Sequence, residues 1–190
     1  MEDKPIKIIH IISSLEKGGA QGLMFEIIKS LEKPKYEHLI ISLKTGNAYA
    51  AITASKSINL ISLNLSPYSL LSSFKKILKT VKEFKPNVIQ SWMYHADFLT
   101  IILKPLLRNI KIIWSFHHAH PKKNKSSSIF IAKFCSHFSS FIPDAIIACS
   151  DLTMREHIDF GYSANKIIVI NNGVNEKRFK YNPKIPLSRE

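Results

Sequence analysis

The sequence has little cysteine, no long apolar run and no signal-peptide pattern. Its two cysteines, Cys135 and Cys149, have a spacing that matches no metal-ligand pattern, so we predict neither a disulfide framework nor a zinc site. No apolar run reaches the roughly 18 residues that a membrane-spanning helix needs. The first residues, MEDKPIK, lack the basic and apolar regions of a signal peptide. We therefore expect a cytoplasmic chain.

Acidic residues are absent from two long stretches. None occurs between Glu37 and Glu83 or between Asp97 and Asp144, and the net charge is +13, from 27 basic and 14 acidic residues. Such a surface attracts polyanions, anionic lipid headgroups or phosphorylated substrates. Alternatively, the lysines simply solvate helix faces. No recognised nucleic-acid motif accompanies the charge, so we do not expect nucleic acid as a partner.

Strand-like and helix-like segments alternate along the 190 residues, a length that suits one domain with a full core. Strands are predicted at 6–12, 37–43, 58–63, 88–91, 109–116, 145–149 and 166–170. Helices are predicted after Gly18-Gly19, weakly at 48–56, at 68–84, from the end of 91–97 to about 107, at 129–141 and at 151–160. The alternation predicts a doubly wound α/β domain with a mainly parallel sheet and helices on both faces.

Local signals predict where several elements begin and end. Pro67 suits the first turn of the helix at 68–84. Ser150 is expected to cap the start of the last helix, and Gly161 its end. Residues 121–128 are basic and rich in serine and have no apolar periodicity, which predicts a mobile loop over the ligand crevice.

The helix predicted at 68–84 is amphipathic and basic. Its apolar stripe consists of Leu70, Leu71, Phe74, Ile77, Leu78, Val81 and Phe84, and lysines occupy the remaining surface. Such a helix either packs its stripe on the sheet or lies near an anionic membrane surface, and the sequence leaves both open.

Gly18 and Gly19 separate the first predicted strand from an amphipathic helix. A helix that begins at a glycine turn points free N–H groups and the positive end of its dipole outward, which suits a phosphate. The glycines could also merely end a loop, because they are not part of a GxGxxG fingerprint.

Polar and aromatic side chains follow the fourth and fifth predicted strands, where an open parallel sheet places its ligand crevice. After the fourth strand these are Trp92, His95 and Asp97; after the fifth they are His117, His118 and His120. His95 and Asp97 are candidates for hydrogen bonds to a ligand, and Trp92 either stacks on a ring of the ligand or fills the core. His117 could equally be a strand-end histidine satisfied by the backbone. The histidine spacing on an extended chain does not favour a metal.

Four segments in fixed order carry a family resemblance: SLEKGGAQ at 14–21, KPNVIQSWMYHAD at 85–97, IIWSFHHAH at 112–120 and HIDFGYSANKIIVINNGVNEKRF at 157–179. Together they resemble the amino-terminal domain of the GT-B glycosyltransferases of glycosyltransferase family 4, most closely the bacterial members that build lipopolysaccharide or capsule. The resemblance implies a Rossmann-like domain at 1–178 and a truncated interdomain linker at 179–190.

The resemblance also implies roles for individual residues. The turn of Gly18, Gly19 and Ala20 would approach the diphosphate of the donor, and His117 would face the donor sugar and the reacting centre as the catalytic residue. The acceptor would lie over Trp92, His95, Asp97 and His118. Asn172 and Gly173 match the Asn-Gly turn that precedes the linker in this family.

The implied activity is transfer of a sugar from a nucleotide-sugar to a glycan or lipid-linked acceptor, with retention at the anomeric carbon. No metal and no cofactor is expected. The donor-binding domain of the family is absent, so a carboxyl-terminal domain or subunit would be a partner, with possible peripheral contact to the inner face of the cell membrane. The alternative is a non-catalytic module that holds an anionic acceptor or a membrane surface.

Overall fold

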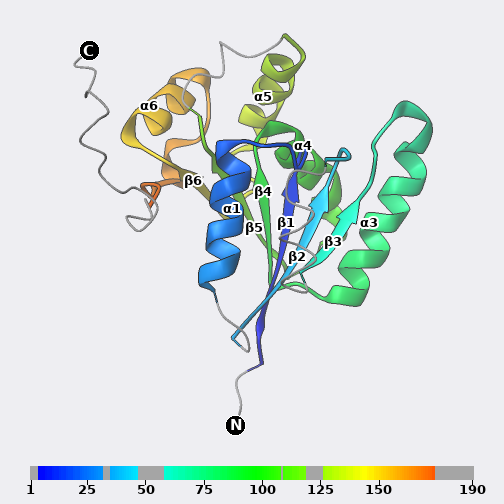
Figure 1. The fold of residues 1–190 in the computed structure, drawn as a ribbon. Helices are drawn as coiled ribbons and strands as arrows, with labels where there is room; N and C mark the ends of the chain where they lie inside the picture. Colours follow the sequence, from blue (N-terminus) through cyan, green and yellow to red (C-terminus); the bar gives the residue numbers. More distant parts are fainter. Residues whose placement is uncertain (1–3, 32–34, 47–57, 108, 119–125, 174–190) are drawn as a thin grey trace, which may run out of the picture.

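The computed structural model describes residues 4–31, 35–46, 58–107, 109–118 and 126–173. Its centre is one sheet in which every pair of neighbouring strands is parallel, in the order β3-β2-β1-β4-β5-β6-β7 (Figure 1). The strands are β1 (Ile6–Ile12), β2 (Tyr36–Ser42), β3 (Asn59–Ser62), β4 (Val88–Trp92), β5 (Lys111–Phe116), β6 (Ala145–Ala148) and β7 (Ile167–Val169). The order reverses between β1 and β4, as in doubly wound folds.

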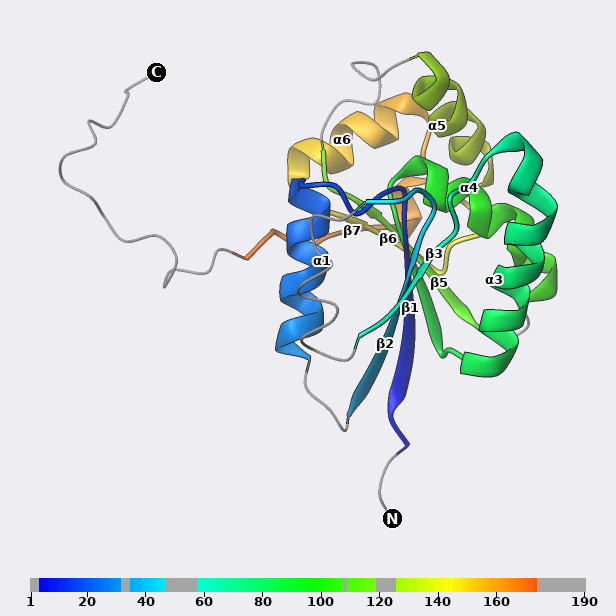
Figure 2. The ribbon, with the colours of Figure 1, turned by 45° about the vertical axis from the view of Figure 1, so that its right-hand side comes forward.

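Helices cover both faces of the sheet. They are α1 (Gly19–Ser30), α3 (Leu70–Phe84), α4 (Tyr94–Leu103), α5 (Ser126–Phe138) and α6 (Asp151–Phe160), with short 3₁₀ turns at Pro67–Ser69, Lys104–Leu106 and Ala164–Lys166. Figure 2 shows α1 on one side of β1 and β2 and α3 on the other. The doubly wound prediction is confirmed. None of the helices among the described residues is both long enough and apolar enough to cross a membrane.

The core forms two layers, one on each face of the sheet. Alternate residues of β1 serve both, since Ile9 and Ile11 belong to the larger cluster and Ile12 to the smaller one. The larger cluster joins the sheet to α3, α4, α5 and α6, and the smaller one packs α1 on β1, β2 and β4. Double-sided burial explains why the sequence of β1 is a nearly continuous apolar run.

Local chemistry sets the ends of α6 as predicted. Ser150 Oγ accepts a hydrogen bond from the Thr153 N–H (3.1 Å), which satisfies one free donor of the first turn. Gly161 has a φ of 114°, a left-handed conformation that favours glycine, and its N–H closes on the carbonyl of His157.

Two predicted loops are wrong. Met93 alone joins β4 to α4, with a φ of 73°, so residues 94–97 form the first turn of a helix and not a loop. Residues 126–128 belong to α5, which begins earlier than expected. The predicted weak helix at 48–56, the remainder of the loop at 121–125 and the linker at 179–190 lie outside the described residues.

Candidate functional site

The ends of β1, β4 and β5 meet at the point where the strand order reverses. Ile12, the last residue of β1, is paired with Trp92, the last residue of β4, and Trp92 is paired with Ser115 of β5. His117 follows Ser115 by two positions and therefore leaves the chain on the same face as Trp92, the face that α1 covers. In an open parallel sheet this edge is where ligands bind.

Gly18 and Gly19, at the start of α1, are suited to their positions for different structural reasons. A Cβ on Gly18 would collide with the side-chain amide oxygen of Gln21, whose Nε2 donates to the Ser14 carbonyl (3.1 Å). A Cβ on Gly19 would meet no atom within 4 Å. Gly18 therefore serves the packing of Gln21, whereas Gly19 leaves open space next to the first turn.

The amino terminus of α1 has the features of an anion site. Gly18 at the N-cap offers no side chain to the first-turn N–H groups, and the first turn contains no acidic residue. The Ala20 side chain packs against the cluster of Trp92 and Ile12, so Ala20 can offer a ligand only its backbone. The helix dipole favours negative charge at this end.

The ring of His117 stacks on the indole of Trp92, with centroids 4.7 Å apart and planes inclined by 20°. Trp92 is fully buried, and its Nε1 donates to His10 Nδ1 (3.3 Å). His10 Nε2 in turn lies 3.0 Å from His38 Nδ1. A continuous row of aromatic rings thus runs across the sheet from His38 on β2 to His117, and it supports one face of the His117 ring.

His117 is a neutral imidazole with unused hydrogen-bonding capacity. Its pKa is lowered to about 4, mainly by burial and in addition by the charge of His118, while the Asn172 side chain acts in the opposite direction. Although Asn172 is close, neither ring nitrogen makes a hydrogen bond of normal geometry to any residue that the structure describes. Asn172 therefore lies beside His117.

Two of the four predicted acceptor residues do not face solvent. Trp92 and Asp97 both have 0% exposure. Ser91 Oγ donates to Asp97 Oδ1 (2.5 Å), Asp97 Oδ2 has no partner among the described residues, and burial raises the pKa of this carboxyl to about 7. Because α4 begins at Tyr94, Asp97 points into the core and cannot touch an acceptor in this arrangement.

The other two predicted acceptor residues are exposed. His95 lies in the first turn of α4, and His118 follows His117. Desolvation lowers the pKa of His95, and the charge of nearby Lys44, which follows β2, adds to this. His120 lies outside the described residues.

Comparison with known proteins shows the family to which the chain belongs. The model of Glycosyltransferase Family 4 matches residues 17–178. The chain belongs to this family. A search of curated proteins gives no match.

Solved structures share the fold. The Anabaena protein HepE in complex with UDP has a TM-score of 0.77 at 19% identity, over 94% of this chain and 47% of that one. A glycosyltransferase from Rickettsia africae has a TM-score of 0.68 at 18% identity, over 96% and 48%. Sucrose-phosphate synthase from Thermosynechococcus elongatus has a TM-score of 0.63 at 14% identity, over 92% and 50%. The family 4 chain therefore spans about half the length of these proteins.

Sequence reasoning missed one residue of this family 4 site. His10 supports Trp92, yet it stands inside an apolar strand and carries no motif. The available signal was strand alternation, which places His10 on the same face as Ile12. Within the described part of the chain, no group of three or more His, Cys, Asp or Glu side chains could hold a metal ion.

Proposed function

We propose that the chain is the acceptor-side half of a retaining glycosyltransferase that moves a sugar from a nucleotide-sugar to a glycan or lipid-linked acceptor. The resemblance in sequence supports a bacterial lipopolysaccharide or capsule as the product. The observation that carries the proposal is the meeting of two groups at one edge of the sheet. These are the start of α1, which has no side-chain cap, and the neutral ring of His117, and both adjoin Trp92: Ala20 packs on its cluster and His117 stacks on its indole.

The start of α1 would bind the diphosphate of the donor. Transfer breaks the bond between the anomeric carbon and the diphosphate, so negative charge grows on the leaving group and must be stabilised. The N–H groups of Gly19 and Ala20, together with the helix dipole, supply fixed positive charge there. The open space at Gly19 allows a phosphate to reach the backbone. Complexes of HepE with UDP and with UDP-glucose support this class of donor.

His117 would orient the donor sugar. A neutral imidazole has one donor and one acceptor nitrogen, so it can bind sugar hydroxyls without bringing a charge. Trp92 fixes the plane of the ring, and is therefore a positioning residue and not an acceptor contact. His95 and His118 are the exposed groups that remain for the acceptor. No metal or cofactor takes part in this proposal, and no described side chain is assigned as a base.

The donor-binding half would be a further domain or a separate subunit, because the relatives are about twice as long as the matched region. The chain by itself is therefore expected to bind a nucleotide-sugar weakly and to catalyse no transfer. Turnover by this chain alone would contradict the division into two halves.

The proposal can be tested by nuclear magnetic resonance with the isotope-labelled chain and UDP-glucose. We expect chemical-shift changes in the amide signals of Gly19 and Ala20 and in the ring of His117. The matched control is glucose without a nucleotide, which should leave the Gly19 amide unchanged. Saturating UDP-glucose that perturbs none of these three residues would refute the proposed donor site.

A further inference from the structure

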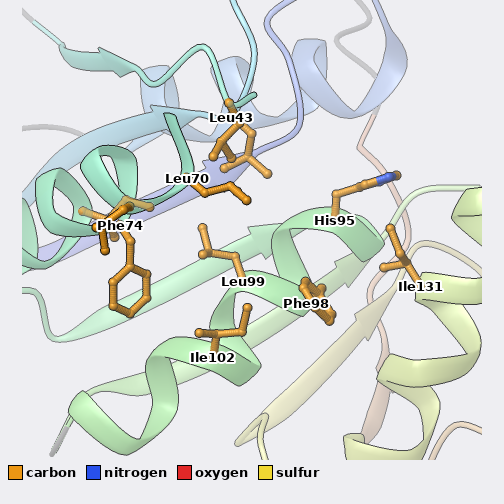
Figure 3. Close-up of a pocket in the computed structure, with 11 residues that line it drawn as sticks. Leu43, Leu70, Phe74, His95, Phe98, Leu99, Ile102 and Ile131 are labelled. Atoms are coloured by element: carbon orange, nitrogen blue, oxygen red, sulfur yellow. The ribbon is translucent and has the colours of Figure 1, made fainter. Parts of the chain in front are cut away.

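An apolar groove lies between α3 and α4, on the face of the sheet opposite to α1 (Figure 3). Its volume is about 500 Å³, within the range of small-molecule sites. Leu70 and Phe74 of α3 face Leu99 and Ile102 of α4 across it. Of the eleven described residues that line the groove, His95 is the one with a polar side chain.

The groove is open to water at its rim. Leu70 is 58% exposed, Leu71 69% and Ile102 46%, although all three are large apolar residues. Continuous apolar surface of this kind on a soluble domain marks a binding site more often than chance. The two helices therefore leave a concave apolar surface unfilled.

The charge around the groove is positive. On α3, Lys75 is exposed and lies one turn after Leu71, which lines the groove. At the other end, Lys44 is close enough to His95 to act on its pKa. No carboxylate is among the described residues that line the groove.

We propose that this groove binds the hydrocarbon chain of an amphiphile with a phosphate headgroup, namely the lipid part of a lipid-linked acceptor. A sugar or an extended peptide would bring hydroxyl or backbone groups that need hydrogen-bond partners, and the lining offers only the His95 ring. A hydrocarbon chain needs none. Lys44 and His95 then meet the phosphate at the end of the groove where the strands end. This inference rests on the proposed function and narrows its acceptor class.

The test is calorimetric titration of the purified chain with octyl, decyl and dodecyl phosphate, each below its micelle concentration. We expect affinity to rise roughly tenfold for each added pair of methylenes, because each buried CH₂ contributes about 0.8 kcal/mol. Inorganic phosphate should bind far more weakly, and decyl maltoside, which lacks the anionic head, should bind more weakly than decyl phosphate. Affinity that does not depend on chain length would overturn the proposal.

Variants locate the binding. Ile102→Glu places a charge against the hydrocarbon and should lower the affinity for decyl phosphate at least tenfold. Ile168→Glu is the matched control, since Ile168 is 54% exposed on β7 and does not line the groove. Lys44→Gln should remove most of the preference for the phosphate over the maltoside. Equal binding by the Ile102→Glu and Ile168→Glu proteins would overturn the proposal.

Failure of this inference is distinguishable from failure of the proposed function. The titrations contain no nucleotide-sugar, and the donor experiment contains no lipid. Shifts at Gly19 and His117 with UDP-glucose, but no binding of alkyl phosphates, would reject the groove as a lipid site and leave the transferase proposal standing.

Discussion

The imidazole of His117 lies face to face with the indole of Trp92, and the indole N–H is held by His10. The orientation of a strand-end ring thus depends on a hydrogen bond made in the interior of the sheet. Trp92→Phe keeps an aromatic platform but leaves His10 Nδ1 without its donor. We expect a loss of about 1–3 kcal/mol in the free energy of unfolding, measured by urea denaturation, and a changed His117 ring signal.

Trp114→Phe is the control for that variant. Trp114 is also fully buried, and its Nε1 donates to Thr100 Oγ1 (2.8 Å), but it packs on the opposite face of the sheet. The Trp114→Phe variant should lower the free energy of unfolding by a similar amount and leave the His117 ring signal unchanged. An unchanged His117 signal in Trp92→Phe would show that the stack does not position the ring.

His117 should stay uncharged well below neutral pH. Since burial lowers its pKa to about 4, its ring signals should not titrate between about pH 8 and pH 5. Protonation of His117 should therefore not change the affinity for UDP-glucose over the same pH range. A titration midpoint near the ordinary histidine value of about 6.5 would contradict the burial of this ring.

Asp97 should make the protein less stable as pH rises. Its pKa is about 7 in the folded chain and 3.8 when unperturbed, so the folded state binds more protons between these values. Stability is therefore full below about pH 4 and falls as pH rises through about 7. Asp97→Asn removes the ionisation. The unfolding free energy of Asp97→Asn minus that of the parent should therefore increase by about 2–3 kcal/mol from about pH 5 to pH 8.

The control for Asp97→Asn is Asp144→Asn. Asp144 is exposed, accepts from Lys111 Nζ (2.8 Å) and the Ile112 N–H (2.9 Å), and these bonds hold its pKa below the usual value. Its stabilisation is lost as pH falls, the opposite direction. If both variants changed stability with the same pH trend, the assignment of Asp97 as a buried, protonated group would be wrong.

The two glycines should separate stability from donor binding. Gly18→Ala forces the Gln21 side chain to move and to give up its hydrogen bond to the Ser14 carbonyl, and it should lower the unfolding free energy by about 0.5–1.5 kcal/mol. Gly19→Ala meets open space and should raise it by about 0.4–1 kcal/mol, because alanine loses less backbone entropy than glycine.

For donor binding, Gly19 is the position at which we expect the larger effect. Gly19→Asp brings a carboxylate to the proposed diphosphate site and should weaken UDP binding at least fivefold in a titration, with Gly19→Ala between it and the parent. UDP affinity that is equal in the parent and Gly19→Asp would remove the start of α1 from the donor site.

The sequence was sufficient where local chemistry decides the outcome. The bounds of β1 and α6 match the prediction, because a doubly buried run and a Ser150–Gly161 pair of caps are local signals. It was not sufficient for the segment after β4. The position after β4 and the family resemblance placed Asp97 in an acceptor loop, but Met93, with its positive φ, starts α4 at once, and Asp97 is buried. Trp92 is buried as the last residue of β4, which is the alternative that the sequence left open.

Pairs that come from distant parts of the chain were also beyond sequence reasoning. No local pattern joins His10 to Trp92, or the α3 leucines to Leu99 of α4 in the groove. The apolar stripe of α3 was visible in the sequence. Which of its residues are buried and which are exposed, however, depends on the distance between α3 and α4. Ile77 is buried whereas Leu70 and Leu71 are exposed, although all belong to the same stripe.

The parallel strand order has a consequence for how the chain acquires its structure. The central strand β1 pairs with β2 on one edge and with β4 on the other, and Ile8 meets Val88 across the second edge. During synthesis, therefore, this largely apolar strand has an unpaired edge until β4 has left the ribosome. Such non-local pairing is slow, and an open apolar edge is prone to aggregate. Nascent chains that stop before β4 should consequently depend on chaperones to remain soluble.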